Sequence, residues 1–207
     1  MEYVAYLLKF HFPVLFKFLN KLTLKFTELK YKARVRELYT KATLTGSIQT
    51  KAAMIRPLQT SDIDSFEDFV NGMPEAHLQF FRPHGFDRIS LYSVLASPAY
   101  LTYGLFIEQK LCAYAMLKLT PTKSAFIGRL VTQELSSLGI GKYLARYLYW
   151  QAGVLGVIPH STISKENVPS MRSHKSIADF EILKELPNNY LLIRFVVKEA
   201  KAPILAL

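Results

Sequence analysis

Five residues, Leu138–Lys142, constrain the fold of this 207-residue chain more than any other stretch. They read Leu-Gly-Ile-Gly-Lys and follow an apolar, strand-like run over 126–131. Beyond them, apolar residues recur at helical spacing until Gly153, where we expect the helix to end. A strand, a glycine loop and a helix N-terminus in succession can bind an anion, because the first amides of a helix lack internal partners. A Gly-x-Gly by itself is a weak signal, since it also marks an ordinary turn into a core helix.

The N-terminal fifth of the chain is the second informative stretch. Residues 1–41 hold nine lysines or arginines against three glutamates, which is +6 of the chain's formal net charge of +10. On a helical wheel its apolar side chains fall on one side and its lysines on another. The apolar set is Leu8, Phe12, Leu15, Phe16, Leu19, Leu22 and Phe26, and the lysines are Lys17, Lys21 and Lys25.

This N-terminal pattern has two competing interpretations. Pro13 starts or kinks the helix, and the lysines interrupt the apolar run before the ~20 residues that a membrane span needs. No small-residue cleavage site of a signal peptide follows. A basic face beside a Phe/Leu face is typical of a helix in the interface of an anionic membrane. A helix packed on the domain, or in the seam of a homodimer, is the alternative, and nucleic acid comes third because no binding motif is present.

Cysteine and histidine usage excludes several kinds of site. The single cysteine, Cys112, rules out an internal disulfide framework and a cysteine-rich zinc site. Its apolar neighbours make it a poor nucleophile. The five histidines are scattered, so we expect no metal site. We expect a cytoplasmic protein, at most peripheral on the inner face of the membrane.

The spacing of apolar residues and breakers divides the chain into an extension and one domain. We expect a basic amphipathic helical extension and linker over 1–50, and a globular α/β domain over 51–207. Residues 42–52 read as a linker or as an extended connection. Within the domain we predict strands at 53–58, 100–107, 111–119, 124–131, 161–164, 181–186 and 190–197. We predict one helix that ends at 71 and three more that span 89–95, 140–153 and 167–178.

The run Leu130–Leu144 resembles the acetyl-CoA motif of the GNAT (GCN5-related) N-acetyltransferases. That family writes Arg or Gln, two residues, Gly, one residue, and Gly or Ala. Gly139 and Gly141 match, whereas Ser136 stands at the Arg/Gln position, which removes a side chain but leaves the amides. The predicted order of strands and helices over 53–198 also resembles the GNAT fold, a mixed sheet with helices on both faces.

The resemblance implies a set of residues that bind acetyl-CoA, the acyl-donor substrate. A second family element, Asn-x-x-Ser, matches Asn167 and Ser170, and His174 stands near the position of a family tyrosine that protonates the departing thiolate. A surface histidine is an equally good interpretation of His174. The implied binding residues are Leu130, Val131, Ser136, Leu138, Gly139, Ile140, Gly141, Lys142, Asn167 and Ser170.

The activity implied is direct transfer of an acetyl group from acetyl-CoA to a primary amine of a small molecule. His84 and Glu134 are our candidates for the base that accepts the amine proton. The loop 80–86 is rich in phenylalanine and faintly resembles the acceptor loop of GNAT enzymes of surface-polysaccharide biosynthesis, which favours an amino sugar as acceptor. The alternative is a catalytically degenerate GNAT domain that serves as a membrane-associated or protein-binding module, because Ser136 and the residue before Phe180 depart from the family pattern.

Overall fold

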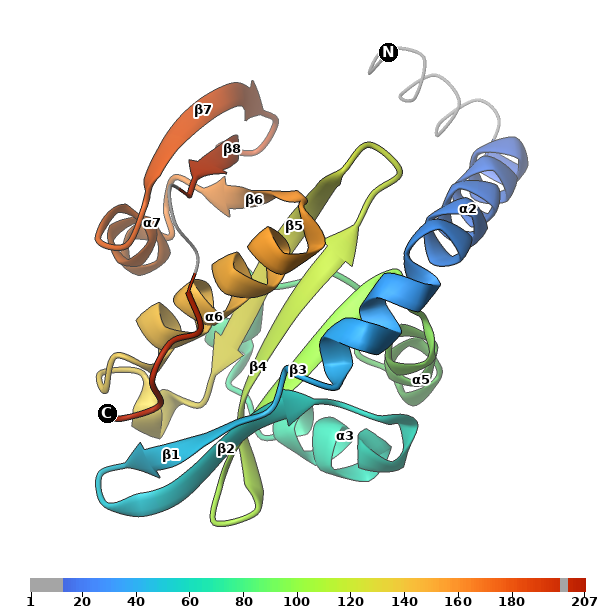
Figure 1. Cartoon of the computed structure of the whole chain (residues 1–207). Helices are drawn as coiled ribbons and strands as arrows, with labels where there is room; N and C mark the ends of the chain where they lie inside the picture. The colour runs from blue at the N-terminus through green and yellow to red at the C-terminus, as the bar shows by residue number, and fades with distance from the viewer. Residues whose placement is uncertain (1–12, 198–200) are drawn as a thin grey trace.

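A single mixed sheet organises the molecule, for which a computed structural model describes residues 13–197 and 201–207 (Figure 1). Its eight strands lie in the order β1-β2-β3-β4-β5-β6-β8-β7, and β5 and β6 form the parallel pair among antiparallel neighbours. The strands are β1 Leu44–Ile48, β2 Lys51–Pro57, β3 Tyr100–Ile107, β4 Lys110–Leu119, β5 Ser124–Val131, β6 Ile158–Ser164, β7 Asp179–Leu186 and β8 Tyr190–Val196.

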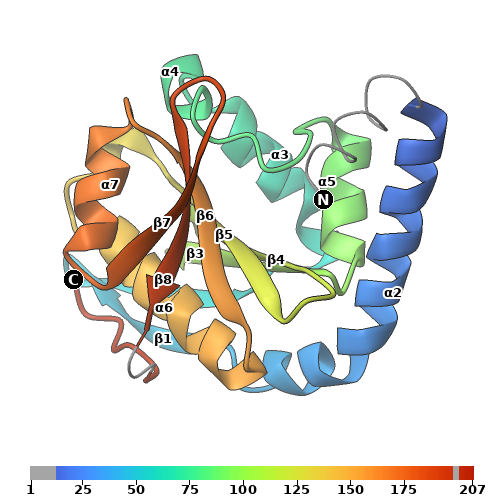
Figure 2. The same cartoon turned by 90° about the horizontal axis from the view of Figure 1, so that it is seen from above.

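Helices cover both faces of this sheet, as the sequence predicted. They are α2 Pro13–Tyr39, α3 Ile63–Asn71, α4 Glu75–Leu78, α5 Arg88–Ala96, α6 Ile140–Leu155 and α7 Val168–Lys175, with short 3-10 turns η1 Thr60–Asp62 and η2 Gln133–Leu135. Figure 2 shows α6 on one side of the sheet and α3 and α5 on the other. The central strands β3 and β4 are therefore buried on both faces, which explains their almost unbroken apolar runs.

Helix α6 ends one turn later than predicted. Gly153 lies inside the helix, and Gly156 ends it in the left-handed conformation (φ 62°), with its amide bonded to the carbonyls of Ala152 and Gly153. A left-handed residue after the last turn is the usual site of a terminating glycine, whereas a glycine in the helix interior is merely tolerated. The spacing pattern could not tell the two glycines apart.

Of the two interpretations of residues 42–52, the linker is wrong and the extended conformation is found. These residues form β1 and the start of β2, joined by a tight turn in which Gln49 and Thr50 both have positive φ (48° and 69°). The outer edge of β1 meets the C-terminal segment, where the Ser47 amide donates to the Leu205 carbonyl at 3.0 Å. A partner so distant in sequence leaves no local signal. That residues 1–50 form a unit apart from 51–207 stays a prediction.

The N-terminal helix packs with a face other than the one predicted to be apolar. Within α2, buried Tyr31, Val35 and Leu38 join the core beneath α6. The described members of the predicted apolar face are instead exposed: Leu15, Leu19, Leu22 and Phe26. Leu8 and Phe12 lie outside the described residues. No described helix is long and apolar enough to cross a membrane.

Candidate active site

Strands β5 and β6 part along their length and leave a cleft. Their pairing covers Ser124 to Phe126 on β5, opposite Ile158 to His160 on β6, and stops there although both strands continue. The Thr132 amide donates to the Cys112 carbonyl of β4. Successive residues of a strand direct their N–H groups to opposite sides, so every second residue of β5 directs its amide toward β4 and the residues between direct theirs toward β6. The amides of Arg129 and Val131 therefore face the gap, whereas that of Leu130 is directed to β4. The cleft has a volume of about 710 Å³.

Seven of the predicted site residues line this cleft. They come from β5, the glycine loop, the start of α6 and the region around α7: Leu130, Val131, Ser136, Gly141, Asn167, Ser170 and His174. The parting of the strands and the loop that follows β5 thus bring together two motifs about 30 residues apart. Gly139 and Lys142 line a neighbouring cavity beside the C-terminal segment instead. Ile140 is fully buried in the core, and Leu138 is partly buried against it.

The start of α6 presents unused amides to the cleft. Gly139 precedes the helix in the left-handed conformation (φ 77°), and its carbonyl accepts the amides of Lys142 and Tyr143 at 2.9 and 3.0 Å. Within residues 13–197 and 201–207, no hydrogen bond uses the amides of Ile140 or Gly141. A Cβ built on Gly141 would meet no atom within 4 Å, so the fold itself does not require glycine there. These features suit the close approach of an anion to the backbone.

Arg129 supports this loop from the strand below. Its guanidinium Nη1 donates to the Gly141 carbonyl oxygen. Burial lowers the pKa of Arg129 to about 10, which leaves the group protonated at neutral pH. No ion pair with a carboxylate is found for it among the described residues. No role was predicted for Arg129, although a charged side chain inside the apolar run 126–131 was a visible signal.

His174 is buried rather than on the surface. Only 3% of it is exposed, its Nδ1 lies 3.0 Å from the Tyr149 hydroxyl, and its ring packs on Phe195 with centroids 4.6 Å apart. Burial and the positive charge of Arg129 lower the pKa of His174 to about 2, so the ring is neutral at physiological pH. A neutral imidazole is a poor acid, which weighs against the predicted role as proton donor to the thiolate. That role stays a prediction.

Asn167 shapes the opposite wall. Its side-chain oxygen accepts the Ser170 amide at 3.2 Å and thereby caps α7, with Pro169 in the first turn of the helix. The two motif residues are therefore tied to each other as well as to the cleft. This contact accounts for their spacing without any ligand, so the spacing alone does not establish that they bind one.

The two predicted bases do not reach the cleft. The Nδ1 of His84 contacts the Gly85 carbonyl at 2.8 Å and its Nε2 contacts the Tyr114 hydroxyl at 3.0 Å, with the ring edge-on to Phe86. Desolvation lowers the pKa of His84, and it is not among the cleft-lining residues. Glu134 is exposed in η2 and is not among them either.

The far end of the cleft combines three residues of the predicted acceptor loop 80–86 with three side chains for which no role was predicted. They come from α4, the loop after it, β4 and β5: His77, Phe80, Phe81, Arg82, Lys118 and Phe126. No local pattern around His77 predicts this location, because it depends on where α4 packs. Among the described residues, no cluster of three or more His, Cys, Asp or Glu side chains could hold a metal ion.

Comparison with solved structures places this geometry in a known architecture. The chain is similar to the GNAT domain of S. lividans PAT, with a TM-score of 0.65 and 10% identity over 75% of this chain and 97% of that one. The chain has the GNAT fold. It is also similar to the PaiA N-acetyltransferase from Thermoplasma acidophilum in complex with coenzyme A, with a TM-score of 0.59, 12% identity, and coverage of 69% and 97%. A third similar structure is the aminoglycoside acetyltransferase AAC(6')-Ib in complex with coenzyme A. It gives a TM-score of 0.55 and 16% identity, over 72% of this chain and 96% of that one.

The predicted fold class is confirmed by these likenesses, which at such identities show the GNAT fold alone. No protein-family model matches the sequence, and no curated protein matches it. In this GNAT fold the Gly-x-Gly motif follows β5 and opens α6, where the sequence placed it.

Proposed function

We propose that this protein is an acetyl-CoA-dependent N-acetyltransferase that acts on the primary amine of a small molecule. The observation that carries the proposal is the parting of β5 from β6 next to the unused amides at the start of α6. A gap between strands can take an extended thioester arm, and the helix N-terminus can take a diphosphate. Two solved structures with the same fold are described as complexes with coenzyme A, which supports this choice of donor.

The residues of the cleft fit such a donor in their chemistry. The amides of Ile140 and Gly141, with the cation of Arg129 behind them, would face the diphosphate. Asn167 and Ser170 line the opposite wall. Ser136 bonds to the Gln133 carbonyl at 2.9 Å and offers no cation, so we expect weaker binding than an arginine there would give.

The reaction needs a donor to the developing oxyanion and an acceptor for the amine proton. The Val131 amide faces the gap and is our candidate for the oxyanion, because a backbone N–H fixed in a strand needs no reorganisation. The amine attacks the thioester carbonyl, the C–S bond breaks, and the thiolate leaves. Among the described residues, two histidines line the cleft, His77 and the buried His174. We therefore propose His77, in place of His84 and Glu134, as the acceptor of the amine proton.

The far end of the cleft supports an amino sugar that carries an anionic group as the acceptor. Phe80, Phe81 and Phe126 offer aromatic faces that suit a sugar ring, and Arg82 and Lys118 offer positive charge. Gly128 lets the Phe81 ring pack closely on β5, because a Cβ there would lie 2.9 Å from that ring. A phosphorylated or nucleotide-linked amino sugar combines these features.

The test has two stages. Calorimetry with acetyl-CoA comes first, and absence of binding at millimolar ligand would end the proposal. Release of free thiol is then followed with a panel of amines that includes a neutral amino sugar, a phosphorylated amino sugar and a nucleotide-linked one. Binding without turnover on any amine would favour the alternative of a degenerate module.

A pair of variants then tests the acceptor end. Arg82→Met should lower kcat/KM for the phosphorylated acceptor by about tenfold or more and leave that for the neutral acceptor unchanged, because it removes one charge-assisted hydrogen bond. The matched control is Arg172→Met, a basic residue of α7 that does not line the cleft. Equal losses on both acceptors for Arg82→Met would contradict recognition of an anionic group.

A further inference from the structure

Helix α2 displays an apolar stripe that nothing in the described chain covers. At about 100° per residue the members of the stripe fall within an arc of about 100° that runs along four turns. Their exposed fractions lie between 39% and 78%. The stripe consists of Leu15, Phe18, Leu19, Leu22, Phe26 and Leu29. Six large apolar side chains in one row exceed the scattered apolar residues of an ordinary surface, and such rows mark interaction sites.

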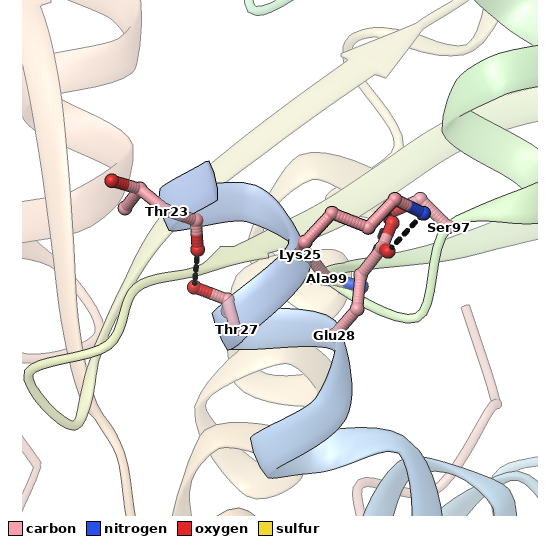
Figure 3. Close-up of polar contacts among 6 residues, drawn as sticks. All are labelled: Thr23, Lys25, Thr27, Glu28, Ser97 and Ala99. Carbon is pink, nitrogen blue, oxygen red and sulfur yellow. Dashed lines mark hydrogen bonds and ion pairs between the residues drawn. The ribbon is translucent and has the colours of Figure 1, made fainter. Parts of the chain in front are cut away.

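The opposite side of α2 fixes the stripe toward the outside. Thr27 is buried and bonds to the Thr23 carbonyl, and Glu28 accepts the Ser97 hydroxyl at 2.7 Å and the Lys25 ammonium at 2.9 Å (Figure 3). Ser97 lies in the turn between α5 and β3, far along the chain. Further down the helix, Arg34 Nη2 donates to the Leu155 carbonyl at 2.5 Å. The contacts of Glu28 with Ser97 and of Arg34 with Leu155 hold the helix in one rotation, so the stripe cannot turn inward without losing them.

Lysines border the stripe on both sides. On a helical wheel Lys21, Lys25 and Lys32 follow one edge and Lys30 follows the other. Lys25 pairs with Glu28, and the Lys30 ammonium donates to the Pro121 carbonyl, so Lys21 and Lys32 are the edge lysines that we expect to contact headgroups. Acidic residues in α2 are limited to Glu28 and Glu37. Long lysine side chains can lie along apolar surface and still keep their ammonium groups in a polar layer.

Two partners could cover the apolar stripe, a second copy of this chain or a lipid surface, and the lysines at its edges favour the lipid surface. A second copy of the chain would bring a second row of lysines against the first, and like charges across a seam are unfavourable. An anionic lipid surface offers apolar depth to the leucines and phenylalanines, and negative headgroups to the lysines.

We propose that the exposed stripe of α2 docks this protein on the surface of anionic lipid bilayers, with the helix lying in the interface. The helix enters to the depth of its apolar side chains, and the lysines at its edges contact the headgroups. The side of α2 held by Glu28 and Tyr31 keeps the domain attached above the bilayer. This inference does not depend on the proposed acetyltransferase activity.

Flotation of the full-length protein with lipid vesicles tests the proposal. Wild type should float with vesicles that contain phosphatidylglycerol, bind pure phosphatidylcholine vesicles much more weakly, and lose affinity as salt rises. Leu22→Ser and Phe26→Ser should each lower the affinity by about tenfold, because each removes one apolar side chain from the bilayer. Lys21→Gln with Lys32→Gln should abolish the preference for anionic lipid and keep the residual binding to phosphatidylcholine.

The controls separate the stripe from general stickiness and from folding defects. Val154→Ser and Ile182→Ser remove exposed apolar side chains of α6 and β7, and should leave flotation unchanged. All variants should melt like wild type, since every substituted residue is exposed. Flotation of Leu22→Ser and Phe26→Ser equal to wild type would overturn the proposal. So would a wild-type dimer in sedimentation that these two variants convert to monomer while vesicles fail to bind.

Discussion

Gly141→Asp places a carboxylate where the proposed diphosphate would lie, at the second residue of α6. The structure predicts that the fold accepts this change. A Cβ at this position meets no atom within 4 Å, and the backbone is not left-handed there, in contrast to Gly139. An acidic residue in the first turn of a helix is favourable by about 0.3–1 kcal/mol, and replacement of a helical glycine adds a contribution of similar size. The free energy of unfolding should therefore stay constant or rise by about 1 kcal/mol.

Binding of acetyl-CoA should change in the opposite direction. Two like charges about 4 Å apart repel by about 1 kcal/mol in bulk water and by about 4 kcal/mol at the effective permittivity of a protein surface. The loop is partly exposed, so we expect a loss of about 2–4 kcal/mol, which corresponds to a dissociation constant about 30- to 1000-fold higher. A variant that is at least as stable as wild type yet fails to bind is the specific signature of an anion site.

Calorimetry with acetyl-CoA and thermal unfolding without ligand measure the two effects separately. Gly141→Asn is the matched control, because it has nearly the same shape without the charge. The reasoning predicts that it binds acetyl-CoA far better than Gly141→Asp does. Wild-type affinity in a folded Gly141→Asp protein would refute the assignment of the loop, and equal losses in the two variants would show that bulk rather than charge is responsible.

Three further predictions concern proton linkage and packing. His174 has a folded-state pKa of about 2 against an ordinary value of 6.5, so only the unfolded chain gains its proton as pH falls below about 6.5; His174→Phe should therefore flatten the loss of stability between pH 6.5 and 4 in urea titrations. Hydrogen bonds from Arg56, both 2.7 Å long, lower the pKa of Asp62 from its ordinary 3.8, so Asp62→Asn should cost about 1–3 kcal/mol of unfolding free energy at pH 7, and urea titrations should show this cost shrinking as pH falls below 3.8 and through the lowered folded-state pKa, where wild type loses the same contribution. Gly46→Ala would bring a Cβ within 1.8 Å of the Leu205 carbonyl oxygen. It should therefore destabilise the protein by about 1–3 kcal/mol and expose the C-terminal segment to carboxypeptidase. An unchanged melting temperature together with resistance to digestion would contradict this packing.

The parts of the fold that depend on neighbours in sequence were accessible from the sequence. The hairpin of β3 and β4, the strand β5, and the loop into α6 all follow from apolar spacing and from where glycine and proline fall. The Gly-x-Gly motif also predicted unused amides at a helix start, because that property belongs to any helix and needs no tertiary contact. The end of α6 shows the limit of such reasoning, since Gly153 and Gly156 look alike until their φ angles are known.

The candidate site was only half visible for a different reason. Gly141 and Asn167 belong to local motifs, and the sequence located both. His77 lines the cleft and His84 does not, because the placement of α4 and its loop decides which ring faces the gap. Arg129 acquires its role from one contact with the carbonyl of Gly141. Such choices depend on packing between segments distant in the chain.

The sequence by itself determined the strand–loop–helix unit, the basic character of the N-terminus and the order of elements that make a GNAT fold, because these are set by periodicity and by local backbone preferences. Tertiary structure alone decided where β5 leaves β6, that residues 44–48 form a strand, and which side of α2 is covered. A helix with apolar side chains on two opposite sides has no local preference between them. The side of α2 that carries Tyr31 and Val35 packs into the core of the domain. In this orientation Glu28 accepts the Ser97 hydroxyl.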